Sequence, residues 1–590
     1  MIEPRIYRVA FAPAVLAVVL VMFSLQSSPK PLEQGLPADV VFEGAAAQTQ
    51  AQRIVDAAPD RRAGTAGDRR AARLVADAFR QSGFTVEVDR FDRDEGQLVN
   101  VVGRRAGESG RQIVVVADRD ASGIPDAAGS ASDTAALLQL ARVFEGRPSE
   151  KTLVLASVDG SALGQVGATR LMRSLPDPGQ VDGIVTVSEL GYAGSDPPAV
   201  IGWSTDTDRA SQSLQRTAAA SVREETGSSP PATGALGQAG RLSFPLGIGA
   251  QGVLLGGGYD AVRVAGGGER EDTSDTTGDA IDRDRLGTLG RVMLRTVNAL
   301  DGASRDPGRP GAYVTVAGQV MPGWVLAVLG LTLILPALVA SVDAFARVRR
   351  RRSPVTPWLA WLAAATFAFV LGIGLAHLLD LVGAVDPPAA PVAPDLVPVD
   401  AGALAVMAGV LIVVVGAWIG LRRAAVAADP DLAVASAPGA AVVLSLAMSA
   451  GVVVLWLVNP FSALVMVPAL HLWMLATLVD PAPGKRTRLA LVAGGLVLPA
   501  LLVIYQLLVL GLNPLAGTWY LLLLVTGGHI SVVSSLLGCL FVGILGGVIA
   551  VARSTPPEAP RPPREVPKVR GPAGYAGPGS LGGTDSALRR

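Results

Sequence analysis

Four short polar groups stand out in the first half of the chain. Three of them each follow a stretch that is typical of a buried strand, and the fourth lies in the loop before the last expected helix. They are Asp118-Arg119-Asp120, Asp159-Gly160-Ser161-Ala162, Ser188-Glu189 and the acidic run 269–275. Carboxylates gathered in one cleft can bind hard cations through oxygen, or act as general acids and bases. Imidazole and thiolate, which complete most protein zinc sites, are absent from residues 30–318. The three histidines of the chain are His377, His471 and His529, and its single cysteine is Cys539.

The elements that would position these groups alternate between strands and helices. Short apolar runs at 112–117, 151–157 and 183–187 are typical of strands buried on both faces. Alternating strands are expected at 84–90 and 97–102, and helices near 51–56, 68–81, 134–144, 162–175, 208–225 and 281–299. This order predicts an α/β domain with a doubly wound mixed sheet, whose sites form at the carboxyl ends of strands. The residues expected to share one cleft there are Asp118, Asp120, Asp159, Ser161, Ala162, Ser188, Glu189 and Glu271.

A series of short motifs between residues 50 and 300 follows the order of a known family. They are Arg62-Ala63-Gly64-Thr65, the strand ending at Asp120, the helix 132–142, the strand 153–160, Gly167, the strand 182–188 with Gly191, and Asp275-Thr276. In order and spacing they resemble the co-catalytic zinc aminopeptidases, the family of bacterial leucyl aminopeptidases, glutamate carboxypeptidase and the transferrin receptor ectodomain. The resemblance implies a sheet of zinc-aminopeptidase type in a multi-pass membrane form.

The same resemblance implies two zinc ions held by imidazole and carboxylate ligands, with a glutamate as general base. Against that pattern, Asp120 keeps a ligand position, and the bridging aspartate falls near Gly129, with Asp126 or Asp133 as alternatives. The departures are Asp118 for the first histidine, Ser161-Ala162 for the Glu-Glu pair, Ser188 for the next aspartate and Glu271 for the last histidine. Most zinc ligands and the base are therefore missing, and we expect neither a catalytic residue nor a zinc site.

Other uses of these residues stay open. The remaining carboxylates could bind calcium, or they could be neutralised by Arg119, Arg263 or Arg270 in surface ion pairs. A serine hydrolase is excluded because the domain has no histidine base. The glycine runs 256–258 and 266–268 lack the context of a phosphate-binding loop, and no basic stripe predicts nucleic-acid binding. No cofactor is expected.

Residues 320–552 hold long apolar runs with few charges. The first run, at 9–25, is either a signal peptide or an uncleaved anchor, and the anchor is the preferred interpretation. Seven further spans are expected at 322–342, 357–383, 401–421, 438–458, 461–480, 489–511 and 529–552. The run 519–525 is too short to cross. Basic residues lie in the loops after every second span, so the positive-inside rule places both termini in the cytoplasm and residues 30–318 outside the plasma membrane.

The chain therefore divides into an anchor (1–29), an extracytoplasmic domain (30–318), a transmembrane bundle of about seven helices (319–553) and a disordered cytoplasmic tail (554–590). Polar residues expected inside the membrane are His377, Asp380, His471 and His529, which are either functional or hydrogen-bonded between packed helices. The preferred hypothesis is a catalytically inactive, peptidase-like module that binds a peptide or envelope protein or acts as a scaffold at the cell envelope. The alternatives are an active metallo-aminopeptidase with a rebuilt site, and a transporter or assembly component.

Overall fold

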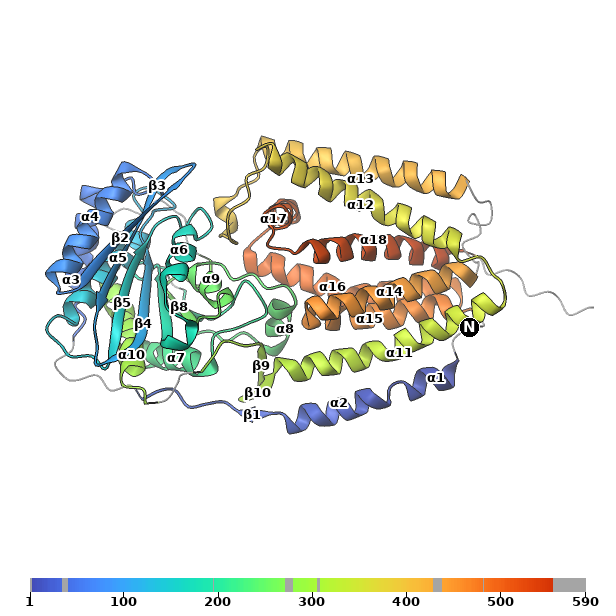
Figure 1. Ribbon diagram of the computed structural model, residues 1–590, viewed down its shortest axis with the longest axis horizontal. Helices are drawn as coiled ribbons and strands as arrows, with labels where there is room; N and C mark the ends of the chain where they lie inside the picture. The colour runs from blue at the N-terminus through green and yellow to red at the C-terminus, as the bar shows by residue number, and fades with distance from the viewer. Residues whose placement is uncertain are drawn as a thin grey trace, which may run out of the picture.

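The computed structural model describes residues 3–33, 41–194, 196–270, 280–304, 308–427, 438–480 and 482–554. They form an α/β domain at one end of the molecule and a bundle of long helices at the other (Figure 1). The expected cleft residue Glu271 and the tail 555–590 lie outside these described ranges.

A seven-stranded mixed sheet forms the centre of the α/β domain. In spatial order its strands are β2 (Thr85–Arg93), β3 (Gly96–Arg105), β5 (Lys151–Val158), β4 (Ser109–Asp118), β6 (Val181–Ser188), β8 (Ala261–Ala265) and β7 (Ala199–Ile201). The strands β5, β4, β6 and β8 run parallel, and the remaining pairings are antiparallel. From β4 the chain continues to β5 on one side and then returns to β6 on the other, so β4 lies at the point where the strand order reverses. The prediction of a doubly wound mixed sheet is confirmed.

Helices cover both faces of this sheet. One face carries α4 (Ala66–Gln81), α5 (Ser132–Val143), α7 (Gln212–Thr226) and α10 (Arg283–Asp301), with α3 (Gly44–Ala57) packed over α5 and α10. The other face carries α6 (Val166–Ser174) and α9 (Ala250–Gly256), which lie between the sheet and the helical bundle (Figure 1). A short helix, α8 (Ala235–Ser243), sits at the junction with the bundle.

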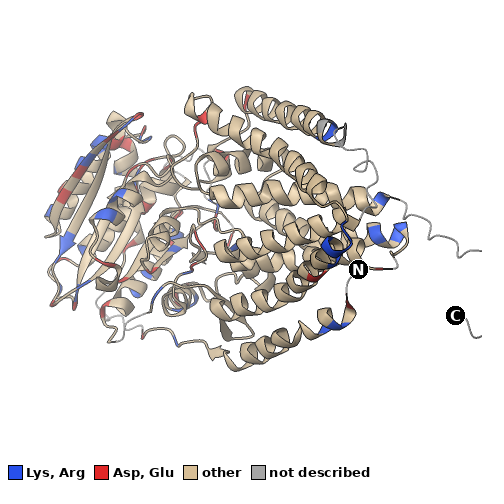
Figure 2. Cartoon of the chain, turned by 45° about the vertical axis from the view of Figure 1, so that its right-hand side comes forward, with Lys and Arg blue, Asp and Glu red and all other residues tan. Residues whose placement is uncertain are grey.

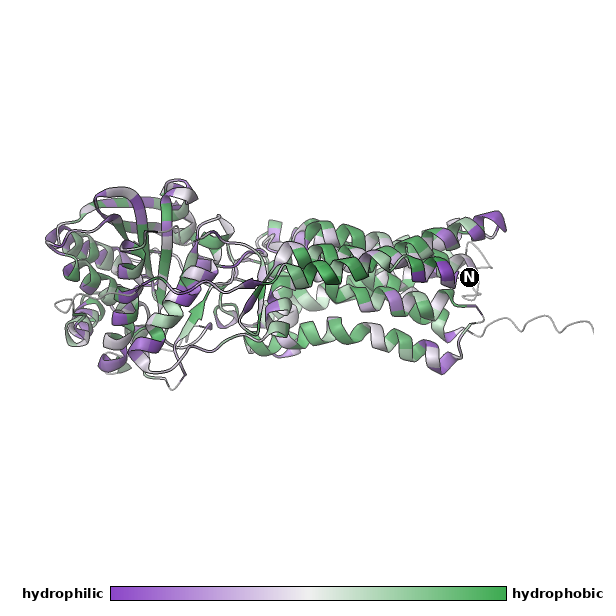
Figure 3. Cartoon of the chain, turned by 90° about the horizontal axis from the view of Figure 1, so that it is seen from below, coloured by the Kyte–Doolittle hydropathy of each residue, from purple (hydrophilic) through white to green (hydrophobic). Residues whose placement is uncertain are grey.

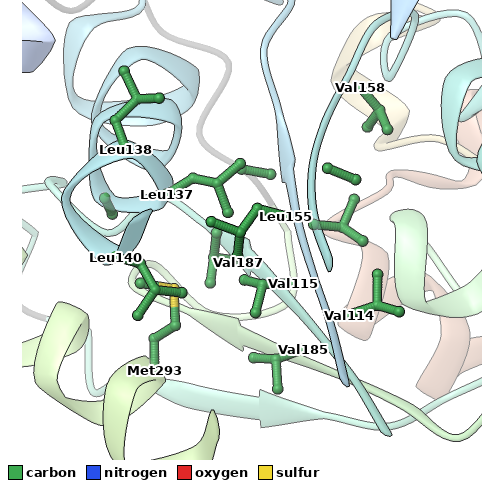
Figure 4. Packing of buried hydrophobic residues seen from close by; sticks show 14 of the residues in the cluster. Val114, Val115, Leu137, Leu138, Leu140, Leu155, Val158, Val185, Val187 and Met293 are labelled. Carbon is green, nitrogen blue, oxygen red and sulfur yellow. The ribbon is translucent and has the colours of Figure 1, made fainter. Parts of the chain in front are cut away.

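The core of the domain explains why β4 was visible in the sequence as an unbroken apolar run. Residues 113–117 of β4 are at most 1% exposed, because neighbouring strands and helices cover both of its faces. In Figure 4, Leu137 and Leu140 of α5 and Met293 of α10 pack toward Val115 and Val185. Burying one such side chain stabilises the fold by about 1.5–3 kcal/mol.

Ten α-helices form the other end of the molecule within the described ranges. They are α1 (Pro4–Val9), α2 (Ala12–Phe23), α11 (Gly323–Arg350), α12 (Thr356–Leu381), α13 (Ala401–Ala427), α14 (Pro438–Val458), α15 (Pro460–Leu478), α16 (Lys485–Leu510), α17 (Pro514–Thr526) and α18 (Val532–Arg553). Counting α1 and α2 as one segment, eight are long and apolar enough to cross a membrane, in agreement with the eight expected runs. The shorter α17 contains the run 519–525. Figure 3 shows the bundle as almost continuously hydrophobic beside the mixed α/β domain.

Charged residues are unevenly placed along the bundle. The described basic residues near helix ends gather at the end far from the α/β domain, around the N-terminus in Figure 2. They belong to the segments at Arg5 and Arg8, 349–352, 422–423, 485–488 and Arg553.

The α/β domain sits directly on the bundle. The amide of Asn459, between α14 and α15, donates a hydrogen bond to the carbonyl of Leu242 at 2.9 Å, and the amide of Gln506 in α16 donates to that of Phe244 at 3.1 Å. The chain passes between the bundle and the α/β domain after α2 and again before α11. At these two points a small sheet forms from β1 (Gln26–Ser27), β10 (Gln319–Pro322) and β9 (Tyr313–Val316). The two parts therefore share one packed junction.

Candidate functional site

The carboxyl ends of the parallel strands enclose a small acidic cavity of about 30 Å³. Its lining residues are Asp118, Asp120, Ser122, Asp126, Gly129, Ser130, Asp133, Ser161, Val187, Ser188 and Glu189. Five of the eight residues expected to share a cleft therefore do so. Ala162 contributes only its backbone, Asp159 lies apart, and Glu271 is not described. A space of this size holds about two water molecules.

Asp120 is the most buried of the expected residues in the cavity, at 2% exposed. The backbone N–H groups of Ser161 and Ala162 donate to its two carboxylate oxygens at 2.9 and 3.3 Å. These donors come from the loop after β5, so Asp120 ties that loop to the end of β4. Burial raises the pKa of Asp120 to about 6, although the two N–H donors favour its charged form.

Two further carboxylates, Asp126 and Asp133, complete the cavity wall. Asp133 accepts the backbone N–H groups of Glu189 and Leu190, both at 2.9 Å, and so holds the turn after β6. Asp126 accepts the N–H of Ser130 at 3.1 Å at the start of a tight turn before α5. Burial raises the pKa of both carboxyls, that of Asp133 strongly. Sequence comparison offered both residues only as alternatives for a bridging position.

Ser188, the last residue of β6, and Glu189, the first residue of the following turn, also line the cavity. Glu189 adopts a left-handed backbone conformation, with φ of 56°, and its carboxylate lies against Gly267, where an added Cβ would come within 2.4 Å. Ser188 is 5% exposed, and within the described ranges its hydroxyl has no hydrogen-bond partner. These two side chains are thus packed in place by their neighbours.

Asp159 belongs to a separate ion-pair cluster around Arg119. The Arg119 guanidinium is fully buried and donates two hydrogen bonds to Asp68, at 2.9 and 2.6 Å, and one to the carbonyl of Val99 at 2.6 Å. Asp159 lies 3.5 Å from the same guanidinium. Burial and the nearby charge of Asp68 raise the pKa of Asp159, because one guanidinium cannot neutralise two carboxylates.

This cluster corrects the expectation of surface ion pairs. Arg119 does neutralise a carboxylate, but it does so in the interior, and its partner is Asp68. In the sequence, Asp68 looks like an ordinary acidic residue in the first turn of a helix. Arg263 donates to the carbonyl of Glu269, and Arg270 donates to the carbonyl of Leu510 in the bundle at 3.2 Å.

The family-like motif at residues 62–65 has a structural explanation. Thr65 caps α4 by accepting the N–H of Asp68 at 3.2 Å, and Gly64 supplies the left-handed turn before it, with φ of 74°. The side chain that reaches toward the cavity is that of Arg61, which donates to the carbonyls of Pro125 and Asp126 at 2.9 and 3.1 Å. Arg62 instead pairs with Asp60 at the surface.

The donor set does not fit a pair of zinc ions. The α/β domain has no imidazole or thiolate, and both oxygens of Asp120 and of Asp133 already accept backbone N–H groups. Within the described ranges, no three His, Cys, Asp or Glu side chains are placed to share a metal ion.

The polar residues of the bundle are placed as follows. His471 of α15 accepts or donates at Nδ1 with the Tyr7 hydroxyl, 2.8 Å away, and at Nε2 approaches the carbonyl of Leu333 at 2.9 Å. His529, before α18, donates from Nε2 to the carbonyl of Pro388 at 2.9 Å. His377 and Asp380 lie near the end of α12 that faces the α/β domain.

No protein-family model matches this chain, and no curated protein matches it. Similar solved structures include a zinc aminopeptidase from Bacillus subtilis, 13% identical with a TM-score of 0.38 over 44% of this chain and 95% of that one. A glutaminyl cyclase of an Acidobacteriales bacterium is 16% identical, with a TM-score of 0.36 over 46% and 99%. An aminopeptidase from Aneurinibacillus sp. strain AM-1 is 12% identical, with a TM-score of 0.34 over 43% and 93%. Identities this low attach no activity to the chain, whose chemistry must be argued from its own side chains.

Proposed function

We propose that this protein is a membrane-embedded binding or scaffolding protein whose peptidase-like α/β domain is not a catalyst. The observation that carries the proposal is the state of the cavity carboxylates. Asp120 and Asp133 each use both oxygens to fix backbone loops, in a cavity of about 30 Å³. Groups engaged in this way stabilise the strand ends, which argues against Asp120 or Asp133 as a general base.

The proposed partner is a polypeptide of the cell envelope that contacts the surface of the domain. The proposed orientation in the plasma membrane has both termini in the cytoplasm and the α/β domain outside. It is supported by the gathering of basic residues at the far end of the bundle (Figure 2), since basic segments remain on the cytoplasmic side. A transport role receives no specific support, because the described contacts of His471 and His529 are hydrogen bonds between neighbouring segments.

The test separates binding from catalysis in the source organism. A strain that lacks the gene is complemented with the full chain, with a chain lacking residues 41–304, and with the double variant Asp118→Asn/Asp120→Asn. We expect the double variant, expressed so that its amount in the membrane equals that of the wild type, to reverse the growth or envelope defect of the deletion strain, and the truncated chain to fail. Purified full-length protein, supplied in turn with zinc, manganese and cobalt, should release no product from aminoacyl-anilides. Metal-dependent hydrolysis that the double variant abolishes would contradict the proposal and favour a rebuilt metallo-aminopeptidase.

A further inference from the structure

The connection between α12 and α13, residues 384–400, leaves the bundle and reaches the α/β domain beside α6 (Figure 1). We call these residues the strap. Several of its side chains are buried although it has almost no regular structure, among them Val385, Ala390 and Val392 at 3%, 7% and 3% exposed. A surface loop would ordinarily leave such residues exposed. The strap is therefore packed between the two parts of the molecule.

On the bundle side, two polar side chains hold the strap. His529 donates from Nε2 to the carbonyl of Pro388 at 2.9 Å, and the hydroxyl of Tyr520 in α17 donates to the carbonyl of Val392 at 2.8 Å. The second bond is buried, where a polar group that loses its partner costs about 1–3 kcal/mol. The helix α17 and the connection that follows it therefore both contact the strap.

On the other side, the strap meets the loop that follows β5. The N–H of Ala389 donates to the carbonyl of Leu163 at 3.3 Å. The next residue, Gly164, has φ of 86°, and an added Cβ would lie 2.4 Å from the backbone nitrogens of both Ala389 and Ala390. Only glycine permits this approach of two backbones.

The same loop forms one wall of the acidic cavity. Its N–H groups at Ser161 and Ala162 donate to Asp120 at 2.9 and 3.3 Å, and the amide of Gln165 donates to Asp118 at 3.4 Å. One short loop therefore touches the cavity carboxylates at two points and the strap at a third. Hydrogen bonds and short stretches of backbone therefore connect Asp120 with α17 and with His529 in the connection after it.

We propose that the strap fixes the loop 159–165, so that the acidic cavity has its observed shape only while the bundle and the α/β domain are in contact. The strap is then a conformational device that makes the site sensitive to the arrangement of α17 and α18. The inference rests on backbone contacts and holds whatever the domain binds. An α/β domain separated from the bundle would have a loosened cavity wall.

Hydrogen exchange of the full chain in lipid nanodiscs tests the proposal, with the amides of Ser161 and Ala162 as the reporters. His529→Ala and Tyr520→Phe each remove one bond to the strap. Tyr520→Phe keeps the aromatic ring, which lies in one buried cluster with Leu246 and Ile248 of the α/β domain, and removes only the hydroxyl. We expect either change to speed exchange of the reporters about fivefold, the effect of losing one net hydrogen bond. His377→Ala, a histidine of α12 at the same end of the bundle, is the matched control and should leave the reporters unchanged.

A second comparison changes the loop itself. Gly164→Ala should speed reporter exchange well beyond Gly146→Ala, because Gly146 has a similar φ of 69° but no atom within 4 Å of an added Cβ. Both variants introduce backbone strain, but only Gly164→Ala also disturbs the contact with the strap, so their difference reports the loss of that contact. Reporter exchange that is unchanged in both His529→Ala and Tyr520→Phe, or equal in Gly164→Ala and Gly146→Ala, would overturn the proposal.

Discussion

Replacing Arg119 by methionine should destabilise the α/β domain more than any loss of a surface charge. The guanidinium is fully buried and donates two hydrogen bonds to Asp68, with Asp159 3.5 Å away. Methionine fills similar space but leaves the buried carboxylate of Asp68 without its counter-charge. Removing one partner of a buried ion pair costs about 3–5 kcal/mol. At about 2–4 °C per kcal/mol for a domain of this size, the melting temperature should fall by roughly 6–20 °C.

The measurement is a thermal melt of the full chain in detergent, read by proteolysis of the α/β domain. Arg62→Met is the matched control, since Arg62 bonds Asp60 in the same two-pronged geometry, at 3.0 and 2.9 Å, but at the surface. Exposed pairs contribute about 0–1 kcal/mol. If Arg119→Met melts within a degree or two of Arg62→Met, the buried cluster is not the stabilising feature described above, and the reasoning is refuted.

Three further predictions concern pH, the amino-terminal helix and the domain junction. The pKa of Asp120 is about 6 in the fold, against about 3.9 in an unfolded chain. Between these pH values the folded state binds more protons than the unfolded state. The free energy of unfolding therefore falls, by up to about 3 kcal/mol, as pH rises through that window. Melts at pH 5 and pH 7.5 check this, and a higher melting temperature at pH 7.5 would contradict it. Because Tyr7 bonds His471, mass spectrometry should find residues 3–27 retained in the membrane protein, and Tyr7→Phe should cost about 0.6 kcal/mol in a melt. Asn459→Ala leaves the carbonyl of Leu242 without its donor and should lower the melting temperature by a few degrees. Asn513 is an exposed residue between α16 and α17, and Asn513→Ala should lower the melting temperature less.

The parallel strands β4, β5 and β6 could be predicted because each is an apolar run buried on both faces. The strand β8 could not, since its short run Ala261-Val-Arg-Val-Ala carries Arg263, which is buried by tertiary contacts that no local pattern shows. The sheet of β1, β10 and β9 pairs Gln26 with Val320, almost the whole α/β domain apart in sequence. Pairing over such a separation leaves no local signal.

The candidate site divides in the same way. The residues at the strand ends could be predicted, because parallel strands bring their carboxyl ends to one edge. The role of each residue could not. Asp159 follows a buried strand as Asp120 does, yet its side chain joins the Arg119 cluster, because that arginine is paired with Asp68 from a helix 51 residues earlier. The strap at 384–400 reads only as a loop rich in proline and aspartate, and its contacts depend on how the two parts pack.

Metal analysis of the full-length protein tests the central claim most directly. The chain is purified without chelators, equilibrated with zinc by dialysis, and compared with the Asp118→Asn/Asp120→Asn variant. If the cavity carboxylates serve the fold, wild type and variant will hold the same zinc, at the level of the protein-free buffer. Two zinc ions per chain in the wild type, lost in the variant, would contradict this account.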